Sequence, residues 1–302
     1  LFIVTEDWAF VTHRLHTAVN AQKKGFEVAV LARLSEEQSK LQDAGVKHFS
    51  FPISRGSLSI LNAFISIICI RRVLKLYKPD VVHAVSIKPV IFSGLITLLT
   101  DFRNGYRLVF ALGGLGHLFL SSKLKTKLLR FFILIALKVV FSNRKCTLIL
   151  QNKDDATDLM KEKIINRSKI KFIKGAGVET EKFKFLPIKN GRPKVLLPAR
   201  LIYEKGIFEF VEAAKIVNEN ERVADFVIAG KFDPDNPSGI PEKTLQNWVA
   251  EGWVKYLGHQ QDMLKVYADA TIVCLPSYRE GLPKALLEAA SVGRPLISFS
   301  VP

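Results

Sequence analysis

The sequence predicts an α/β protein built from two doubly wound parallel-sheet domains in tandem. Its 302 residues are about twice the length of an ordinary domain. Apolar runs of strand length alternate with helix-like stretches along the chain, which is typical of parallel sheets covered by helices on both faces. The alternation stops at residues 178–192, where Pro187, Gly191 and several lysines indicate a linker, and then restarts. We therefore expect one domain over residues 1–187 and a second over residues 188–302.

The first domain is expected to alternate strictly between strands and helices. Apolar runs predict strands at residues 1–4, 27–31, 46–49, 81–84, 108–111, 147–150 and 170–173. The stretches between them predict helices at residues 10–24, 35–44, 58–77, 90–99, 124–141 and 154–163. Gly25 and Gly45 mark two helix ends, because a left-handed cap residue is needed there.

The second domain repeats the pattern. Strands are expected at residues 194–197, 225–228, 254–257, 271–275 and 296–300, and helices at residues 207–217, 242–250, 263–268 and 284–292. Ligands of such sheets bind beyond the carboxyl ends of the strands, so two facing sheets predict a cleft between the domains. Both ends of the chain look cut, since residue 1 is not Met and the chain stops just after a strand. The second domain is therefore expected to be incomplete.

Composition excludes several classes of protein. A chain that is 48% hydrophobic and 24% charged is neither disordered nor a coiled coil. Cys69, Cys146 and Cys274 lie too far apart in sequence for a disulfide framework or a CxxC metal knuckle, and they fit a reducing compartment. The longest apolar runs, residues 58–70 and 131–137, fall short of the roughly 18 residues that indicate a membrane span.

The positive charge belongs to the first domain. The chain carries a formal net charge of +16, and residues 1–190 hold 31 Lys and Arg against 14 Asp and Glu. Between Asp101 and Asp154 there are ten basic residues and no acidic one. Such asymmetry favours an anionic partner, which is a nucleic acid, a membrane surface or an acidic substrate. The alternative is a solvated basic face that serves solubility.

The most informative motif spans residues 276–288, PSYREGLPKALLE. An expected strand ends in a loop that holds Glu280 and Gly281, and Pro283 opens a helix whose first amides are free to bind a phosphate. Glu288 follows within an apolar helical segment, where a carboxylate is costly unless it is paired. Two carboxylates in this arrangement suit the hydroxyls of a sugar and of a ribose. The alternative is that Glu280 caps the helix and Glu288 is exposed.

Two further motifs lie at the carboxyl ends of expected strands. In LPARLIYEKG, Arg200 and Lys205 offer two cations to hold a diphosphate, unless they are an ordinary pair of loop cations. In IKGAGVE, Gly175 and Gly177 form a glycine-rich turn near the linker, which on its own is also compatible with a simple turn.

Together these motifs resemble glycosyltransferase family 4. The resemblance rests on Glu280 and Glu288 within REGLPKALLEA, on PARL-x3-KG, and on KGAGVE followed by Phe183. It covers nearly the whole chain. The family has the GT-B fold of two Rossmann-like domains and transfers sugars with retention of configuration. HRL at residues 13–15, SIKP at residues 86–89 and GLG at residues 114–116 resemble bacterial enzymes that extend polyprenyl-diphosphate-linked glycans or lipopolysaccharide.

The resemblance implies roles for individual residues. The first domain would bind the acceptor and the second the nucleotide-sugar donor, with UDP-sugars the expected donors. Arg200, Lys205 and Glu280 would be catalytic, the two cations on the diphosphate and Glu280 on the hydroxyls of the donor sugar. Glu288 would hold the ribose. The remaining donor contacts would come from Gly177, Gly281, Leu282, Pro283 and Lys284. No metal and no cofactor is expected, because the cations and the helix dipole replace a metal.

The acceptor side departs from the family pattern. Many members have a glycine-rich loop after the first strand, where this chain has TEDWAF at residues 5–10, and a histidine near the acceptor that is shifted here to His117 or absent. A lipid-linked or other glycan acceptor and an anionic membrane surface are the expected partners. The residues assigned to them are His13, Lys88, His117, Lys123, Lys125, Lys127 and Arg130. The expected location is cytoplasmic, on the inner face of the membrane.

Other interpretations rest on lookalike motifs. Asp233-Pro-Asp235 matches the D-x-D of metal-dependent sugar transferases, but its Pro-, Asn- and Gly-rich surroundings favour a turn. His13 and His16, three apart on an expected helix, lack a third metal ligand nearby. A nucleotide-sugar 2-epimerase of the same architecture is the enzymatic alternative. A non-catalytic nucleic-acid binder is disfavoured, because Phe131, Phe132 and Phe141 lie on an apolar helix rather than among the basic residues.

Overall fold

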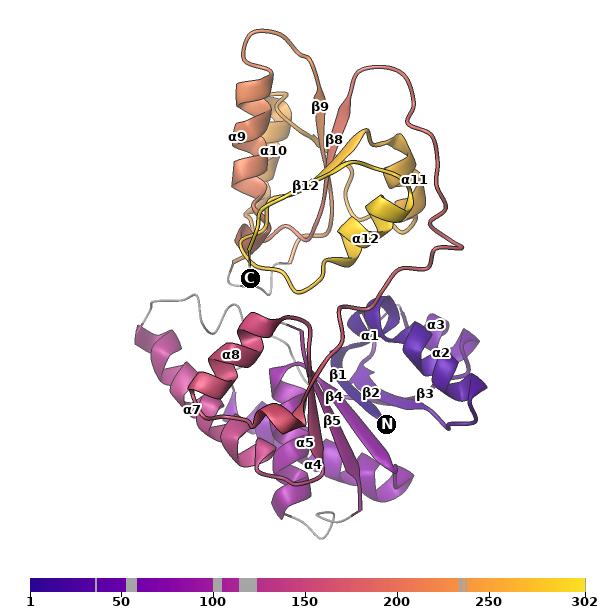
Figure 1. The fold of residues 1–302 in the computed structure, drawn as a ribbon, viewed down its shortest axis with the longest axis vertical. Coiled ribbons are helices and arrows are strands. Elements are labelled where there is room, and N and C mark those ends of the chain that lie inside the picture. Colours follow the sequence, from indigo (N-terminus) through magenta and orange to yellow (C-terminus); the bar gives the residue numbers. More distant parts are fainter. Residues whose placement is uncertain are drawn as a thin grey trace. The chain divides into compact units, whose positions relative to one another are not determined.

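The computed structural model describes residues 1–35, 37–52, 59–99, 105–113, 124–233, 236 and 238–301. The chain divides into two compact units, Leu1–Lys174 and Gly175–Pro302 (Figure 1). This division precedes the boundary that we expected after residue 187. The reason is that the end of the expected first domain packs onto the second unit. Phe183 is 5% exposed within the core of that unit, and the backbone N–H of Leu186 donates to the carbonyl of Val292 at 3.2 Å.

The first unit is a seven-stranded sheet in the order β3-β2-β1-β4-β5-β6-β7, in which neighbouring strands run parallel. The strands are β1 (Phe2–Glu6), β2 (Ala29–Arg33), β3 (Lys47–Ser50), β4 (Val81–Val85), β5 (Arg107–Leu112), β6 (Cys146–Leu150) and β7 (Ile170–Phe172). The described helices are α1 (Asp7–His13), α2 (Leu15–Lys23), α3 (Gln38–Asp43), α4 (Ile60–Tyr77), α5 (Ile87–Leu99), α7 (Leu124–Phe141), α8 (Lys153–Lys161) and the short 3₁₀ turn η2 (Arg167–Lys169). The strand order reverses between β1 and β4, which confirms a doubly wound sheet.

Helices cover both faces of this sheet, because successive strand residues point to opposite faces. Ile3 of β1 belongs to the core that α4, α5, α7 and α8 cover, whereas its neighbours Phe2 and Val4 belong to the core beneath α1, α2 and α3. Residues on both faces of β1 are therefore buried and apolar. This explains why the first strand reads as a continuous apolar run rather than as an alternating one.

The second unit is a smaller parallel sheet in the order β10-β9-β8-β11-β12. Its strands are β8 (Lys194–Pro198), β9 (Asp225–Ala229), β10 (Lys255–Tyr256), β11 (Ile272–Leu275) and β12 (Leu296–Ser298). Its helices are η3 (Tyr203–Lys205), α9 (Ile207–Val217), α10 (Glu242–Ala250), α11 (Met263–Asp269) and α12 (Lys284–Ser291). The helices α9 and α10 cover one face, and α11 and α12 cover the other. Here the strand order reverses between β8 and β11.

The helix expected at residues 10–24 is two helices. The first begins at Asp7, directly after β1, because the Asp7 carboxylate accepts the N–H of Trp8 at 2.7 Å and the N–H of Ser35 at 2.5 Å. It ends at His13, since the backbone of Arg14 (φ −132°, ψ −16°) leaves the helical region. His13 and His16 therefore lie on different helices, and the expected three-residue spacing on one helix is wrong.

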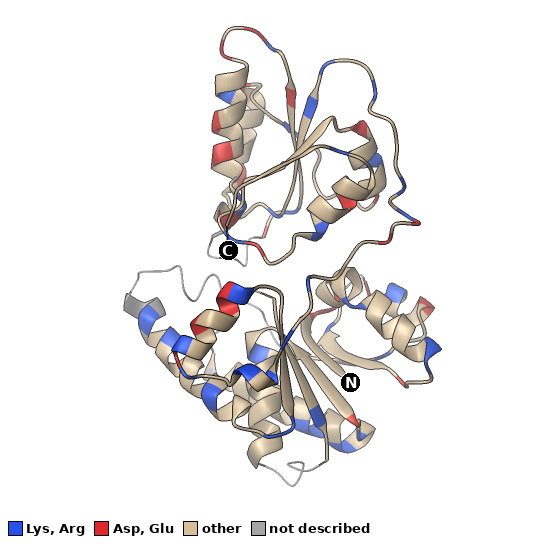
Figure 2. Cartoon of the chain, viewed as in Figure 1, with Lys and Arg blue, Asp and Glu red and all other residues tan. Residues whose placement is uncertain are grey.

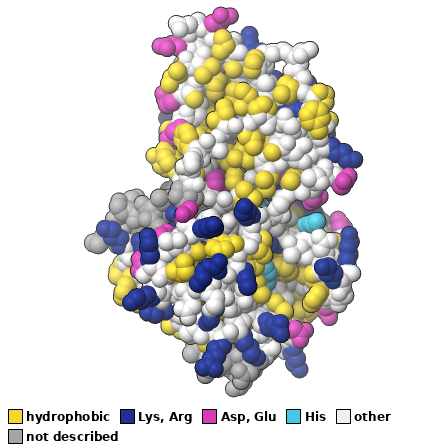
Figure 3. Space-filling view, in the orientation of Figure 1, with side chains coloured by type: hydrophobic (Ala, Val, Ile, Leu, Met, Phe, Trp, Pro, Cys, Tyr) yellow, Lys and Arg dark blue, Asp and Glu magenta, His cyan; other side chains and the backbone are white. Residues whose placement is uncertain are grey.

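Basic side chains dominate the first unit. Figure 2 shows Lys and Arg along the described part of α7 and around the first sheet, and Asp and Glu more evenly mixed with them in the second unit. The space-filling view in Figure 3 likewise shows far more basic than acidic side chains on the visible face of the first unit. Among the helices that the structure describes, none is both long and apolar enough to cross a bilayer.

Candidate active site

The three motifs of the second unit meet at the carboxyl ends of β8 and β11. These two strands are neighbours in the sheet although Pro198 and Leu275 are far apart in sequence. The strand order reverses between them, and the loops that follow such strands diverge and leave a crevice in doubly wound sheets. The loop after β8 carries Arg200 and Lys205, and the loop after β11 carries Glu280.

Backbone contacts hold these loops against one another. The N–H of Tyr278 donates to the carbonyl of Glu204 at 3.0 Å, and the N–H of Tyr203 donates to the carbonyl of Ser238, in the loop after β9, at 2.8 Å. Gly206 follows η3 with φ +69°, and a Cβ atom added there would lie 2.0 Å from the carbonyl oxygen of Pro276. Only glycine permits this close approach between the loop after β8 and the loop after β11.

Each candidate diphosphate-binding cation has a carboxylate partner in the second unit. The Lys205 ammonium forms an ion pair with Glu280 Oε1, and both side chains are about one fifth exposed, at 20% and 19%. Arg200 Nη1 donates to Asp233 Oδ2 at 2.6 Å. The structure therefore brings all three predicted catalytic residues, Arg200, Lys205 and Glu280, together beyond the carboxyl ends of β8 and β11. Two preorganised cations there suit a diphosphate, and the carboxylate suits sugar hydroxyls.

Glu288 is buried and paired, so the exposed alternative is wrong. Glu288 lies on α12 and is 8% exposed. The hydroxyl of Tyr267, on α11, donates to Glu288 Oε2 at 3.1 Å, and the Lys284 ammonium lies 3.4 Å from Glu288 Oε1. Burial, with the Glu288 charge added to it, raises the pKa of the Tyr267 phenol, which therefore stays protonated and donates this bond. Glu280 is not the helix cap either, since the N-cap of α12 is Pro283.

The glycine-rich turn joins the same site. A Cβ atom added to Gly175 would lie 3.1 Å from the Cβ of Leu282, so the turn packs against the loop that leads into α12. Gly177 has φ +74°, and a Cβ atom added there would have no other atom within 4 Å, which leaves open space beside it. Gly281, Leu282, Pro283 and Lys284 are all half-buried between β11 and the first turn of α12.

Sequence reasoning missed the aromatic residues of the site. The rings of Tyr203 and Tyr278 stack with centroids 5.4 Å apart and planes 14° apart, and the Tyr278 hydroxyl bonds to Glu209 in the first turn of α9. Ser238 Oγ donates to Glu204 Oε1 at 2.7 Å. The only signal for these residues was that Tyr203 and Tyr278 each precede a predicted catalytic residue by two positions.

The acceptor-side residues do not form one cluster that the structure describes. His13 is exposed at the end of α1, and Lys88 is half-buried in the first turn of α5, where burial lowers the pKa of its ammonium. Lys127 is exposed on α7, and Arg130 pairs with Glu162 at 2.8 Å. An acidic residue from outside the acid-free stretch of sequence therefore contacts this part of the basic run. His117, Lys123, the side chain of Lys125 and Asp235 lie outside the described residues.

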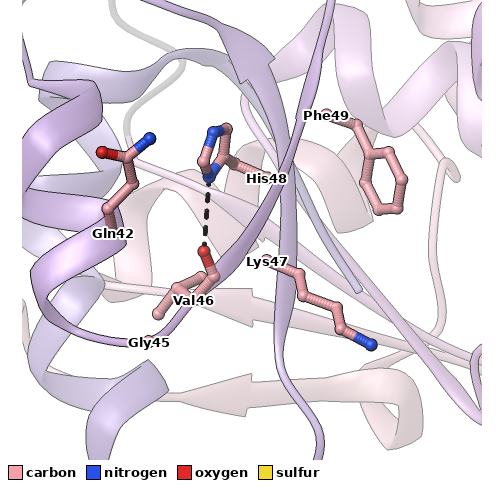
Figure 4. Close-up of a pocket in the computed structure, with 6 residues that line it drawn as sticks. All are labelled: Gln42, Gly45, Val46, Lys47, His48 and Phe49. Atoms are coloured by element: carbon pink, nitrogen blue, oxygen red, sulfur yellow. Dashed lines mark hydrogen bonds between the residues drawn. The ribbon is translucent and has the colours of Figure 1, made fainter.

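A separate hollow lies at the edge of the first sheet (Figure 4). It has a volume of about 460 Å³ and lies between α3 and β3, lined by Gln42, Gly45, Val46, Lys47, His48 and Phe49. His48 Nδ1 lies 3.5 Å from the carbonyl oxygen of Val46, and its Nε2 lies 3.0 Å from Gln38 Nε2. None of the residues predicted to bind donor or acceptor lines this hollow.

The chain contains two doubly wound sheets. Cations and carboxylates gather where the second sheet reverses its strand order. This fold and this site define a nucleotide-sugar-dependent transferase of the GT-B fold. Family comparison agrees: residues 1–152 match the family described as Glycosyl transferase 4-like, and residues 178–302 match Glycosyl transferases group 1. The chain belongs to this glycosyltransferase family, and the predicted resemblance is confirmed.

Two bacterial relatives are similar over most of the chain. The N,N'-diacetylbacillosaminyl-diphospho-undecaprenol alpha-1,3-N-acetylgalactosaminyltransferase of Campylobacter jejuni is 30% identical over 286 residues, which cover 90% of this chain and 72% of that protein. The UDP-Gal:alpha-D-GlcNAc-diphosphoundecaprenol alpha-1,3-galactosyltransferase of Escherichia coli is 29% identical over 291 residues, which cover 91% and 72%.

Solved structures share the fold at low sequence identity. Sucrose-phosphate synthase of Thermosynechococcus elongatus has a TM-score of 0.75 at 16% identity, covering 99% of this chain and 81% of that one. Anabaena HepE, solved with UDP and glucose, has a TM-score of 0.71 at 14% identity, covering 99% and 80%. The predicted α/β fold of two doubly wound sheets is therefore confirmed.

Proposed function

We propose that the protein transfers a hexose or N-acetylhexosamine from a UDP-sugar to a hydroxyl of a lipid-diphosphate-linked glycan, with retention of configuration. The observation that carries this proposal is the gathering of Arg200, Lys205 and Glu280 at the carboxyl ends of β8 and β11, with Glu288 buried on α12, the helix that follows the Glu280 loop. The names of both relatives support it, since each names a diphospho-undecaprenol acceptor and an alpha-1,3 transfer, and one of them names UDP-Gal as the donor.

In the proposed reaction, the bond between the sugar C1 and the β-phosphate oxygen breaks as the acceptor oxygen forms its bond to C1 on the same face. The acceptor proton passes to an oxygen of the leaving β-phosphate. Arg200 and Lys205 stabilise the charge that grows on the diphosphate, and Glu280 orients the sugar through its hydroxyls. The second unit thus binds the donor, and the basic first unit binds the anionic acceptor.

A screen of donors tests this function. The full chain is incubated with UDP-, GDP- and ADP-sugars, with and without an undecaprenyl-diphosphate glycan, and nucleotide release and lipid-linked product are measured. We expect UDP release that is coupled to growth of the lipid-linked glycan. Epimerised donor without acceptor-dependent UDP release would replace the transferase by the 2-epimerase.

A chelator should leave turnover unchanged. The reason is that Arg200 and Lys205 supply the positive charge that a metal ion supplies in metal-dependent sugar transferases. Among the residues that the structure describes, no three His, Cys, Asp or Glu side chains are grouped as a metal site. The measurement is UDP release before and after dialysis against EDTA. Loss of activity that Mg²⁺ or Mn²⁺ restores would reinstate Asp233 and Asp235 as metal ligands.

The buried carboxylate on α12 should control nucleotide affinity. Glu288→Gln should weaken UDP binding by about tenfold or more, since a hydrogen bond to a charged group contributes about 1.5–3 kcal/mol. Tyr267→Phe should weaken it less, because Tyr267 only orients Glu288. Calorimetric titration with UDP measures both constants. Tyr106→Phe, which alters a buried tyrosine of the first unit, is the control, and unchanged affinity in Glu288→Gln would remove the ribose role.

We also infer that the first unit rests on an anionic membrane leaflet through α7 and α4. Both helices pack against α5, and neither contains an acidic residue. One side of α7 is buried against the sheet, with Leu137 and Val140 at 0% exposure, yet Phe131 and Phe132 on its other side are 58% and 59% exposed. On α4, Phe64 is 64% exposed. Exposed aromatic residues beside cations favour binding to anionic lipid.

Removing the cations of the α7 segment should release the protein from vesicles. Changing Lys123, Lys125, Lys127 and Arg130 to Gln should reduce co-sedimentation with phosphatidylglycerol vesicles at low salt, because each basic residue contributes about 1 kcal/mol at such a surface. Transfer to the lipid-linked acceptor should fall, and donor hydrolysis should persist. The control changes four exposed lysines of the second unit to Gln: Lys184, Lys189, Lys243 and Lys265. Equal vesicle binding by both quadruple variants would exclude the α7 segment.

A further inference from the structure

Asp233 occupies a position that the proposed reaction does not explain. Its Oδ2 accepts a hydrogen bond from Arg200 Nη1 at 2.6 Å, and Asn236 Nδ2 lies 3.5 Å from the same oxygen. The Asp233 side chain is 16% exposed and the Arg200 side chain 35% exposed. A charged pair this well covered is screened less by water than a surface pair, so the partner of Arg200 affects what else Arg200 can bind.

The backbone brings Arg200 and Asp233 close together. The loops after β8 and β9 continue the sheet beyond the ends of the strands, since Leu201 and Phe232 form a parallel bridge and the N–H of Leu201 donates to the carbonyl of Lys231 at 3.0 Å. Arg200 immediately precedes this bridge and Asp233 immediately follows it. The N–H of Asn236 also donates to the carbonyl of Asp233 at 3.0 Å. The fold therefore places Arg200 and Asp233 close together, within reach of this contact.

We propose that Asp233 is a built-in counter-ion that competes with the nucleoside diphosphate for Arg200. The proposal rests on the proposed function, in which Arg200 binds the donor diphosphate. In the ligand-free protein the Asp233 carboxylate accepts a hydrogen bond from an Nη1–H of Arg200 and holds the guanidinium in place. A phosphate oxygen that binds Arg200 either takes over this N–H or uses another N–H of the guanidinium, and in both cases it lies near the negative charge of Asp233.

This competition lowers the affinity for every nucleoside diphosphate, the released product included. An anion that binds beside a like charge is disfavoured. Asp233 therefore promotes release of the product, at the expense of tight binding. The Glu280 carboxylate on Lys205 differs in this respect, because the proposed reaction gives it sugar hydroxyls to bind once the donor arrives.

Neutralising Asp233 should strengthen UDP binding. In Asp233→Asn we expect the Kd for UDP, measured by calorimetry on the full chain, to fall roughly three- to tenfold, the scale of one partly covered charge contact. The salt dependence of the Kd should become steeper, and UDP should inhibit turnover at lower concentration. Asp233→Ser, a second neutral replacement, should act in the same direction, which keeps the test valid if either variant is less stable.

Asp269→Asn is the matched control. Asp269 pairs with Lys189 at 3.2 Å and with Lys194 at 2.5 Å in the same unit, so its replacement changes the net charge equally, away from the motifs of the site. Its Kd for UDP should stay at the wild-type value. Unchanged or weaker UDP binding in both Asp233 variants would overturn the proposal, as would metal-dependent loss of activity. Unchanged UDP affinity in Arg200→Ala would instead remove Arg200 from the proposed function, whatever the Asp233 variants show.

Discussion

Replacing Lys205 with alanine should lower the turnover number for sugar transfer by about 10²–10³-fold, and Arg200→Ala should have an effect of the same order, because one preorganised group at the developing charge is worth that much. In the proposed reaction, the paired loops hold both cations at the carboxyl end of β8 while the diphosphate departs. Release of UDP under saturating donor measures the effect. The loss should appear in kcat more than in the melting temperature.

Two other ion pairs of the second unit provide controls for these variants. Lys215→Ala removes a lysine on α9 that pairs with Glu212 at 2.7 Å, and Arg222→Ala removes an arginine that pairs with Asp225 at 3.1 Å. Each control deletes the same type of side chain from the same unit, outside the site. Both should keep near-normal turnover. Near-normal turnover in Lys205→Ala and Arg200→Ala as well would contradict the assignment of Lys205 and Arg200 as catalytic residues.

Gly206→Ala should unfold the second unit more easily and abolish activity. A left-handed backbone costs a residue with a Cβ about 1–2 kcal/mol. The collision of that Cβ with the Pro276 carbonyl should add about 1–3 kcal/mol, the usual cost of overpacking. Urea unfolding in a Trp8→Phe background, where fluorescence reports only Trp248 and Trp253, measures the stability of the second unit.

Gly252→Ala separates the two contributions. Gly252 has φ +80°, yet no atom lies within 4 Å of an added Cβ. This variant should lose only the backbone contribution and keep its activity. Equal losses of stability in Gly206→Ala and Gly252→Ala would show that the close approach of the β8 and β11 loops carries no energy of its own.

Much of the fold could be predicted because its signals are local. The buried strands β8 and β9 read as continuous apolar runs, and their predicted bounds, residues 194–197 and 225–228, differ from the structure by one residue. Local signals failed where a distant contact decides the outcome. Asp7, the first residue of α1, is held by hydrogen bonds from Ser35, and Phe183 joins the second unit because it packs beside Tyr267. Neither partner is near in sequence.

The sequence by itself determined the α/β class, the doubly wound pattern and the basic first unit, and it singled out Arg200, Lys205, Glu280 and Glu288 as candidate site residues. Each of these depends on residue type, on periodicity or on a motif within one loop. Only the tertiary structure decided the partners. Asp233 meets Arg200 across 33 positions, Tyr267 meets Glu288 across 21, and Lys205 meets Glu280 across 75. The pairs of Arg200 and Lys205 form because parallel strands bring the loops at their carboxyl ends together in the order of the sheet, which differs from the order of the chain. Tyr267 meets Glu288 because α11 and α12 cover the same face of that sheet.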